Sequence, residues 1–318
     1  MKRALIGCIA AWVSMGSPVV EAQGEAVMVV EAHSGKVLIG TNSTVKRPVA
    51  SLTKIATGVL VVDWAEAAGV NLEERELVVP ASVAGLPGAN PMRLVPGERL
   101  SLRDAMASTL LGSDNAAALS LADHVGREFL ARKGRSGDPV AAFVGEMNVL
   151  AKALGMKKTK FYNPHGLELP KQVGLSTAAD IAKLSIYAMR RPGFNFITRQ
   201  KERQVTVKGA EGPRGYRVKN TNELVSESVI GLKTGTTRAA GECVAIGVER
   251  APLIRPKADG SKGVTPRRLI IVLLNSPDRF GRAKALIPKG WGIYDAWVRG
   301  GAQVQDRRRE ILDVPNPR

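Results

Sequence analysis

Hydrophobic positions along the 318-residue chain change their spacing from one part to the next. Residues 26–42 contain two runs rich in Val and Ile on either side of Ser34-Gly35-Lys36, a pattern typical of a β-hairpin. From about residue 55 to 200 the apolar residues recur at helical intervals, and from about 203 onward β-branched runs return before one closing helix. This order predicts one antiparallel sheet built from both chain ends, with a helical lobe inserted between them.

The segment boundaries follow from caps, glycines and prolines. Helices are predicted over residues 55–69, 100–126, 138–156, 175–191 and 280–298, the second of them broken at Ser113-Asp114-Asn115. Strands are predicted over residues 203–209, 228–235, 241–249 and 267–275, and the basic Gly/Pro-rich stretch 255–266 predicts a loop. The fold class is therefore α/β of the α+β kind, and a cleft is expected where the sheet and the lobe meet.

The first 22 residues differ from the rest of the chain. Lys2 and Arg3 precede a short apolar run, and a small-residue cleavage pattern ends at Ala22, so we predict a secretory signal peptide at 1–22. An uncleaved anchor is the alternative, but about a dozen apolar residues are too few to span a bilayer comfortably. The expected organisation is a domain over 23–298, with the helical lobe at about 70–200, and a polar C-terminal tail over 299–318.

Cysteine and charge limit the classes of partner. Cleavage after Ala22 leaves Cys243 as the only cysteine, so no intrachain disulfide forms and Cys243 is expected to pack in the sheet. The net charge is +17, and removal of Lys2, Arg3 and Glu21 leaves +16, which favours anionic partners. Export, scattered basic residues and 4% aromatic content argue against nucleic acid. A solvated basic surface with no specific partner remains an alternative.

A serine three residues before a lysine occurs twice, as Ser43-x-x-Lys46 and Ser51-x-x-Lys54. On a helix this spacing places both side chains on one face, where the lysine can act as the base for the serine. Pro48 would cut short a helix through the first pair, whereas the second pair opens a long apolar helix. Burial there would favour the neutral, basic form of Lys54, so Ser51 is the predicted nucleophile. The spacing alone also fits a serine that caps the helix beside a solvent-exposed lysine.

Two further motifs support the catalytic interpretation. Ser113-Asp114-Asn115 lies between two predicted helices, and Lys233-Thr234-Gly235 lies on a predicted strand where Gly235 permits close backbone approach. Each motif alone is also explained as a helix cap or an ordinary edge strand. The order SxxK, SxN, KTG is the signature of penicillin-binding proteins and serine β-lactamases.

With these motifs the sequence resembles the serine-type D-alanyl-D-alanine carboxypeptidases, the low-molecular-mass penicillin-binding proteins of peptidase family S11. The resemblance runs from about Ala26 to Trp297 and includes further segments in the family's order. These are "SGKVL", "RPVASLTKIATG", "LVPGERLSLRDAMASTLLGSDNAA", "FVGEMNVLAKALGM", "KFYNPHGL", "LSTAADIAKL", "NTNEL" and "GLKTGTTRAAGECV". It implies a fold like that of β-lactamases and DD-peptidases, and a periplasmic or extracytoplasmic hydrolase that trims peptidoglycan stem peptides, with a part in cell-wall synthesis and cell shape.

The resemblance also implies roles for the site residues. Ser51 would form an acyl-enzyme with Lys54 as base, and the backbone N–H groups of Ser51 and Thr236 would form the oxyanion hole. Ser113 would relay a proton to the leaving amine, and Asn115 would hold Lys54 and the substrate amide. Lys233 would keep the site positive. β-Lactam antibiotics would act as covalent inhibitors.

Recognition of the substrate is expected from Lys233, Thr234, Gly235 and Arg268. Arg268 opens the strand beside the KTG strand, and an arginine at the matching place in the carboxypeptidases clamps the terminal carboxylate. The alternative for Arg268 is a sheet-end arginine facing water. His33, His124 and His165 are too scattered for a metal site, and no phosphate-binding loop is present, so neither a metal nor a cofactor is expected.

Three other functions compete with carboxypeptidase activity. A β-lactamase would need a glutamate that activates water, and the nearest candidate, Glu146, falls inside a predicted amphipathic helix. A DD-endopeptidase that cuts cross-links fits the short chain, because only about forty residues follow Asn275. A non-catalytic wall-binding module would not need the complete set of motifs. The polar tail predicts no stable membrane anchor and a soluble enzyme after cleavage of the signal.

Overall fold

A computed structural model describes residues 24–170, 172–256 and 260–317, so the predicted signal peptide lies outside the described residues. The central five-stranded sheet is antiparallel, with the order β2-β1-β11-β10-β9. Its strands are β1 (Ala26–Glu31), β2 (Val37–Thr41), β9 (Val229–Thr237), β10 (Gly241–Pro256) and β11 (Lys262–Ser276). The prediction of a sheet built from both chain ends is confirmed, because β1 from the N-terminal end pairs directly with β11.

The sheet is covered on both faces, which explains why β1 is buried along its whole length. Val27 and Val29 point to one face and pack with Trp291 of α7 (Arg279–Arg299). Met28 and Val30 point to the other face, which packs against α1 (Lys54–Ala68) and α5 (Ala178–Met189). Successive side chains of a strand point to opposite faces, so a strand buried on both faces is apolar throughout.

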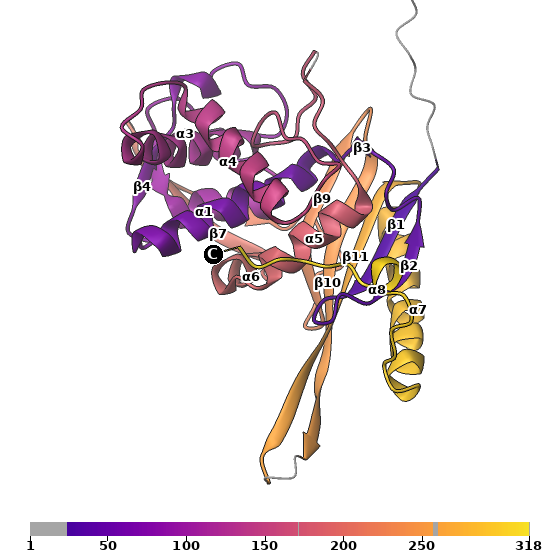
Figure 1. The fold of residues 1–318 in the computed structure, drawn as a ribbon. Helices are drawn as coiled ribbons and strands as arrows, with labels where there is room; N and C mark the ends of the chain where they lie inside the picture. Colours follow the sequence, from indigo (N-terminus) through magenta and orange to yellow (C-terminus); the bar gives the residue numbers. More distant parts are fainter. Residues whose placement is uncertain (1–23, 171, 257–259, 318) are drawn as a thin grey trace, which may run out of the picture.

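The lobe inserted between β3 (Arg47–Pro48) and β9 is mainly helical, as predicted (Figure 1). Besides α1 and α5 it contains α2 (Leu102–Leu110), α3 (Asn115–Arg132), α4 (Pro139–Ala153) and α6 (Pro192–Thr198), with short turns η1 (Ala50–Thr53) and η2 (Ala81–Val83). It differs from an all-helical lobe in one respect. A small sheet of order β4-β5-β7-β8 runs along its edge, and β6 (Leu175–Ser176) pairs with β3. The four strands are β4 (Glu76–Val78), β5 (Arg99–Ser101), β7 (Glu202–Gly209) and β8 (Gly212–Lys219).

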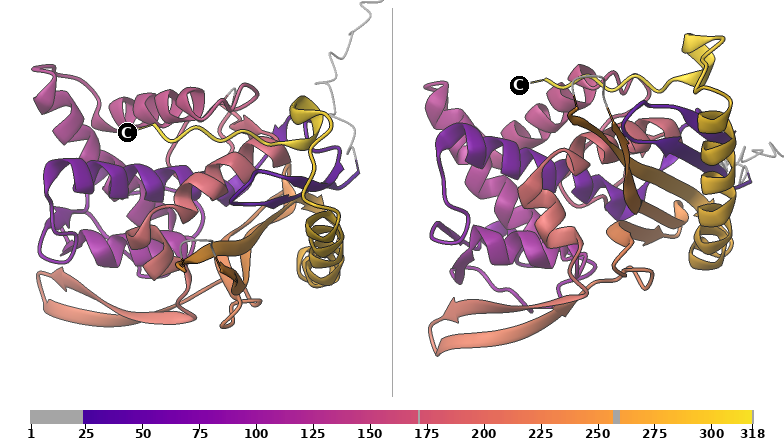
Figure 2. Two further views of the ribbon diagram at one scale, coloured as in Figure 1. Left: turned by 60° about the horizontal axis from the view of Figure 1, so that its bottom comes forward. Right: turned by 90° about the horizontal axis from the view of Figure 1, so that it is seen from below.

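Two features at the C-terminal end differ from the sequence-based expectation. The stretch 255–266, expected as a loop, is strand on both sides of residues 257–259, so β10 and β11 project beyond the sheet as a long two-stranded ribbon (Figure 1). The tail after α7 forms the short α8 (Arg307–Glu310) and then runs back over the molecule towards the helical lobe (Figure 2). It is therefore not a free polar tail.

Candidate active site

Ser51 and Lys54 meet at the start of α1, where a short 3-10 turn leads into the helix. Lys54 is fully buried, and its Nζ lies 2.9 Å from Ser51 Oγ. The preceding residue, Ala50, has a φ of 46°, a left-handed conformation that costs a residue with a side chain about 1–2 kcal/mol. Backbone strain of this kind persists only where surrounding contacts hold it. The turn thus places a serine hydroxyl in contact with a buried amine.

The surroundings of Lys54 bring its pKa close to neutral pH. Burial is the main cause that lowers the pKa of Lys54, to about 7, and the charge of Asp114 opposes it only in part. The same Nζ lies 2.7 Å from Asn115 Oδ1 and 2.8 Å from the carbonyl oxygen of His165. These two acceptors fix the direction of the amine, so that one position remains for the serine hydroxyl. Lys54 therefore has both the geometry and the pKa of a general base.

The first serine–lysine pair has a different placement. Ser43 lies in the turn between β2 and β3, where the N–H of Val45 bonds to the carbonyl of Asn42. Lys46 is exposed to solvent, unlike Lys54. Ser51 is therefore the serine that lies beside a buried lysine.

The turn between α2 and α3 brings the second motif to Lys54. Asp114 caps α3 by accepting a hydrogen bond from the N–H of Ala117, and it also accepts one from the hydroxyl of Ser108. Burial raises the pKa of Asp114. Ser113 has a φ of 59°, which reverses the chain so that Asp114 points into the lobe while Asn115 reaches Lys54. The carboxylate of the motif is thus structural, and its amide faces the site.

Strand β9 closes the site from the side of the sheet. Gly235 lies against the turn that carries Ser51, and a Cβ added to it would come within 3.0 Å of Ser51 N. Thr236 follows Gly235 and is exposed, whereas Thr234 is buried with its hydroxyl 2.6 Å from that of Thr221. Gly235 therefore lies close to the backbone of Ser51, and Thr236 is the next residue along the strand.

Lys233, the first residue of the KTG motif, is a second buried lysine near Lys54. It is buried, and its pKa is lowered well below the ordinary value by burial, then by the charges of Lys54 and Arg279. Its Nζ lies 2.9 Å from the carbonyl oxygen of Thr234. Lys233 and Arg279 are thus two cationic side chains at this end of β9.

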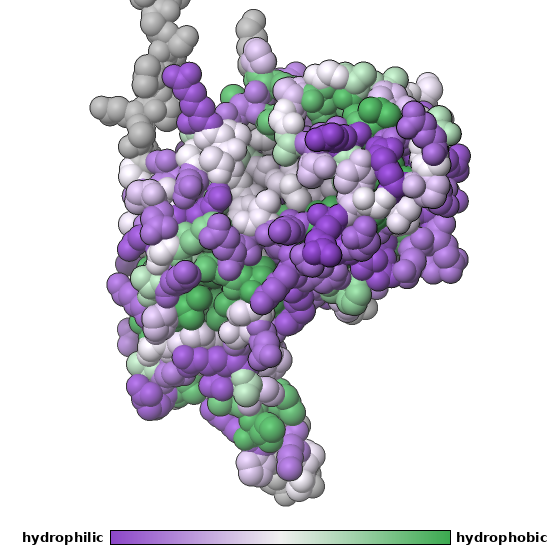
Figure 3. All heavy atoms as spheres, turned by 180° about the vertical axis from the view of Figure 1, so that it is seen from behind, coloured by the Kyte–Doolittle hydropathy of each residue, from purple (hydrophilic) through white to green (hydrophobic). Residues whose placement is uncertain are grey.

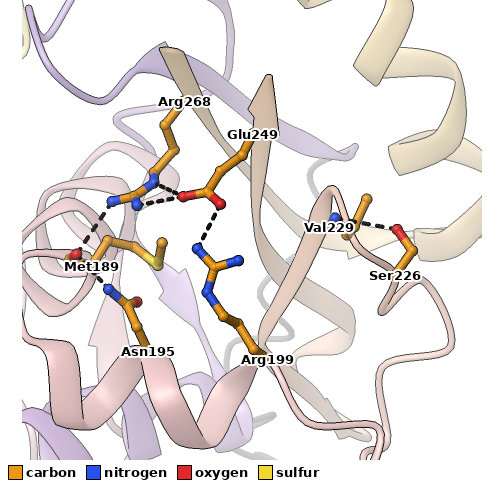
Figure 4. Close-up of polar contacts among 7 residues, drawn as sticks. All are labelled: Met189, Asn195, Arg199, Ser226, Val229, Glu249 and Arg268. Atoms are coloured by element: carbon orange, nitrogen blue, oxygen red, sulfur yellow. Dashed lines mark hydrogen bonds and ion pairs between the residues drawn. The ribbon is translucent and has the colours of Figure 1, made fainter. Parts of the chain in front are cut away.

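Arg268 is not brought to the site, contrary to the expectation from sequence (Figure 4). Its Nε lies 2.8 Å from Glu249 Oε1, its Nη1 lies 3.2 Å from the carbonyl of Met189, and Arg199 binds the other oxygen of Glu249. Arg268 pairs with Glu249 on β10, six residues from Cys243, which pairs with Gly235. At about 3.3 Å per residue, Arg268 is about 20 Å along the sheet from the motif on β9.

Arg279 occupies the place that Arg268 was expected to fill. It is the first residue of α7, and its Nη1 donates to Thr236 Oγ1 at 2.6 Å and to the carbonyl of Gly235 at 3.2 Å. The order of the strands could have identified Arg279 from the sequence, because β9, β10 and β11 are consecutive and each is antiparallel to the next. The C-terminal ends of β9 and β11 therefore lie at the same end of the sheet. The N-terminal end of β11, with Arg268, lies at the opposite end.

Two carboxylates bear on the alternative functions. Glu146 lies on α4 and pairs with Lys133 at 2.5 Å on the outside of the lobe, away from Ser51. Glu168, which the sequence analysis did not consider, lies at the rim of the site and accepts a hydrogen bond of 2.5 Å from Thr237 Oγ1. Glu242 of β10, which pairs with Thr236 in the ladder, is a second carboxylate at this end of β9.

Two further residues that the sequence singled out, His165 and Cys243, are buried. His165 is buried, and burial followed by the charge of Lys54 lowers its pKa to about 3. Cys243 is buried in β10 opposite Gly235, as predicted, and burial raises the pKa of its thiol to about 11. Within the described part of the chain, no group of three His, Cys, Asp or Glu side chains is placed to hold a metal ion.

Comparison with known proteins agrees with this geometry. The profile of the Peptidase_S11 family, described as D-alanyl-D-alanine carboxypeptidase, matches residues 13–251. The D-alanyl-D-alanine endopeptidase of Pseudomonas aeruginosa is 31% identical over 231 residues, which are 71% of this chain and 68% of that protein. The D-alanyl-D-alanine carboxypeptidase DacA of Escherichia coli is 34% identical over 235 residues, which are 71% of this chain. The match spans about half, 52%, of DacA.

Solved structures of similar fold belong to related enzymes. The Streptomyces K15 DD-transpeptidase has a TM-score of 0.69 at 25% identity, with 87% of this chain and 99% of that chain covered. Penicillin-binding protein D2 of Listeria monocytogenes in its cefotaxime-bound form has a TM-score of 0.65 at 26% identity, with 84% and 96% covered. The predicted DD-peptidase-like fold is confirmed. The chain therefore belongs to the peptidase S11 family, the D-alanyl-D-alanine carboxypeptidases.

Proposed function

We propose that this serine DD-peptidase removes the terminal D-alanine from peptidoglycan stem peptides through an acyl-enzyme on Ser51. The observation that carries the proposal is the placement of Lys54, which is fully buried, has a pKa near 7 and contacts both Ser51 and Asn115. A buried amine with these contacts has no evident structural purpose, but it matches the requirement of a serine for an adjacent base.

The proposed reaction has two steps. In the first, Ser51 Oγ bonds to the carbonyl carbon of the penultimate D-alanine while its proton passes to Lys54. The oxyanion accepts hydrogen bonds from the N–H groups of Ser51 and Thr236, the peptide bond breaks, and the leaving amine takes a proton through Ser113. In the second step, water adds to the ester carbonyl and the Ser51 hydroxyl is restored.

Arg279, with Thr234 and Thr236, is the proposed recognition site for the free carboxylate of the substrate. The guanidinium already donates to Thr236 Oγ1, and its Nε is buried without a partner among the described residues. A fork of N–H donors matches a carboxylate better than a single ammonium does. The presence of this group beside Gly235 favours substrates that end in a free D-alanine.

The family and its structures also support the proposed inhibitor and location. Penicillin-binding protein D2 has been crystallised with cefotaxime and with ampicillin, and we propose that β-lactams likewise acylate Ser51 here. We also propose export, directed by the predicted signal at 1–22, to the periplasm or another extracytoplasmic compartment. Among the described helices, none is long and apolar enough to cross a membrane.

The test is intact-mass spectrometry of the protein with and without a penicillin, followed by an assay of D-alanine release from a peptide ending in D-Ala-D-Ala. We expect one stable adduct and release of D-alanine by the wild type and by Ser43→Ala, and neither by Ser51→Ala. An adduct that persists in Ser51→Ala would exclude the proposed nucleophile. Absence of an adduct on the wild type would favour a non-catalytic wall-binding module.

A second candidate is DD-endopeptidase activity on cross-linked peptides. It is favoured by two of the relatives, the endopeptidases of P. aeruginosa and E. coli, of which this chain covers 68% and 64%. The two activities separate in an assay that offers a linear pentapeptide and a cross-linked dimer side by side. Faster cleavage of the dimer, retained in Arg279→Gln, would identify the endopeptidase.

A further inference from the structure

The two-stranded ribbon at the far end of β10 and β11 has no function in the proposed reaction. We call residues 250–256 and 262–267 the arm. It projects from the sheet away from the helical lobe (Figure 1). Ile254 of the arm lies ten residues along β10 from Val244, which pairs with Thr234, so the arm ends about 30 Å from the active site.

The arm exposes apolar side chains that a protein surface normally covers. Ile254 and Val264 are each 60% exposed, the highest values among the large apolar residues that the structure describes. They lie directly opposite each other in the ladder and therefore on the same face of the ribbon. Figure 3 shows apolar and hydrophilic atoms side by side on the projecting part. The two side chains therefore form one exposed apolar pair near the end of the arm.

The charge next to this apolar pair is predominantly positive. Residues 250–268 contain six basic residues and one acidic residue, Asp259. Arg250 is occupied at the root of the arm, where it pairs with Asp295 and stacks on Trp291. Arg255 and Lys262 are exposed, and no ion pair forms between them and any carboxylate of the described residues. They are free to bind an anionic partner close to Ile254 and Val264.

We propose that the arm is a reversible docking site for an anionic lipid bilayer. Ile254 and Val264 would enter the interfacial layer, and Arg255 and Lys262 would lie among the anionic headgroups. A basic surface with an embedded apolar group is the combination that holds peripheral proteins on such membranes. The active site would then be held about 30 Å from the membrane, on the side where polymer substrates lie.

Features of the arm argue against other occupants. Pro252, Pro256 and Pro266 have no N–H to donate, so the edges of the ribbon are poor templates for an added strand. A second copy would bring two sets of basic residues together. One face of a two-stranded ribbon is also small beside the roughly 800 Å² per partner of a stable protein interface. A bilayer needs neither a complementary strand nor a shaped pocket.

The test is co-sedimentation of the full chain with phosphatidylcholine vesicles that contain or lack phosphatidylglycerol, after intact mass has shown the same N-terminus in every sample. The wild type should bind the phosphatidylglycerol vesicles. The Arg255→Gln/Lys262→Gln protein should bind about 30-fold more weakly, because each basic residue near such a surface contributes about 1 kcal/mol. The Ile254→Ser/Val264→Ser protein should lose about tenfold or more through the loss of apolar burial.

Val149→Ser is the matched control, since Val149 is 58% exposed but lies on α4 of the helical lobe. Its vesicle binding should equal that of the wild type, and all variants should react normally with penicillin, which shows that they fold. Equal vesicle binding by the wild type and the arm variants would overturn the proposal. A loss of vesicle binding in Arg255→Gln/Lys262→Gln alone would mean that the arm binds anions without apolar insertion, as it would bind a soluble polyanion. This result would also overturn the proposal. Self-association of the wild type without vesicle binding would assign the arm to a second copy instead.

Discussion

One proton on Lys54 sets the reactivity of the whole site. Because burial lowers its pKa to about 7, the neutral base is a minor form below that pH and the major form above it. Acylation by a penicillin should therefore rise as the pH increases through about 7 and level off at higher pH. The measurement is the second-order rate constant for a fluorescent penicillin, followed from about pH 5.5 to 9.

The control for this prediction is a lysine replacement that keeps the charge. Lys54→Arg carries a guanidinium that stays protonated throughout this range, so its acylation should be about 10²- to 10⁴-fold slower. A wild-type rate that does not change across neutral pH would mean that Lys54 is not the base that activates Ser51.

Two arginines on neighbouring elements allow a matched comparison. Arg279 contacts Thr236 at the site, whereas Arg268 binds Glu249 about 20 Å away. Arg279→Gln should lower kcat/KM for peptides with a free D-alanine terminus by about 10- to 100-fold, the value of a lost charge-assisted hydrogen bond. The same change should have little effect on a peptide whose terminus is an amide.

Arg268→Gln supplies the control. It should leave kcat/KM unchanged and lower the melting temperature, because Glu249 would retain only Arg199 as an ion-pair partner. Loss of carboxylate recognition in Arg268→Gln, with normal kinetics in Arg279→Gln, would reverse our assignment.

At the scale of residues, the sequence predicted which groups meet but not how each is charged. Ser51, Lys54 and Asn115 lie in motifs whose spacing is local, and the structure brings them together. The lowered pKa of Lys233 depends on burial and on two cations from other elements, and no local pattern contains that information. Arg268 was chosen from its strand alone, without regard to which end of the sheet that strand presents to the site.

At the scale of elements, one glycine sets the distance between β9 and the turn that carries Ser51. A Cβ on Gly235 would lie 3.0 Å from Ser51 N and 3.2 Å from Leu52 N, and these are backbone atoms that cannot move aside cheaply. Gly235→Ala should slow acylation by about 100-fold, since small misplacements of reacting groups have effects of this size. The melting temperature of Gly235→Ala should fall only slightly.

Gly247→Ala is a matched control in the same sheet. Its added Cβ would lie 3.5 Å from Met189 Cε, an ordinary contact with the end of a flexible side chain. Acylation should stay within about twofold of the wild type, in line with the small effect of surface-like or tolerated changes. If Gly235→Ala also acylates at the wild-type rate, the close approach of strand and turn is not required for the reaction.

The long periodic elements could be predicted from sequence, and the short or unusual ones could not. The hairpin at the N-terminal end and the long helices contain long apolar runs or amphipathic periods. β4 and β5 are three residues long and contain too few positions to show a period. The arm was expected to be a loop because it contains glycines and prolines, which are typical of loops. A ribbon outside the core buries neither face, so its strands need not alternate apolar and polar residues.

At the scale of the whole molecule, the C-terminal segment ties the sheet to the helical lobe. The N–H of Leu312 bonds to the carbonyl of Gly35 in the β1–β2 turn, and Arg190 at the end of α5 donates to the carbonyl of Val314. Leu312 and Val314 pack against the main core. This docking could not be predicted from the sequence, because two apolar residues in a polar segment show no periodicity.

This docking should contribute to stability without affecting the reaction. Leu312→Ser/Val314→Ser should reduce the free energy of unfolding by about 2 kcal/mol and the melting temperature by about 4–8 °C, because both half-buried side chains lose apolar contact. Asp313→Ala changes the exposed residue between them and should leave the melting temperature unchanged. Calorimetry of the three proteins, with penicillin acylation measured at a permissive temperature, distinguishes the possibilities. A double variant as stable as Asp313→Ala would show that the segment lies on the surface without holding it, whereas a stable fold with slow acylation would mean that the segment acts on the site through α5 and α1.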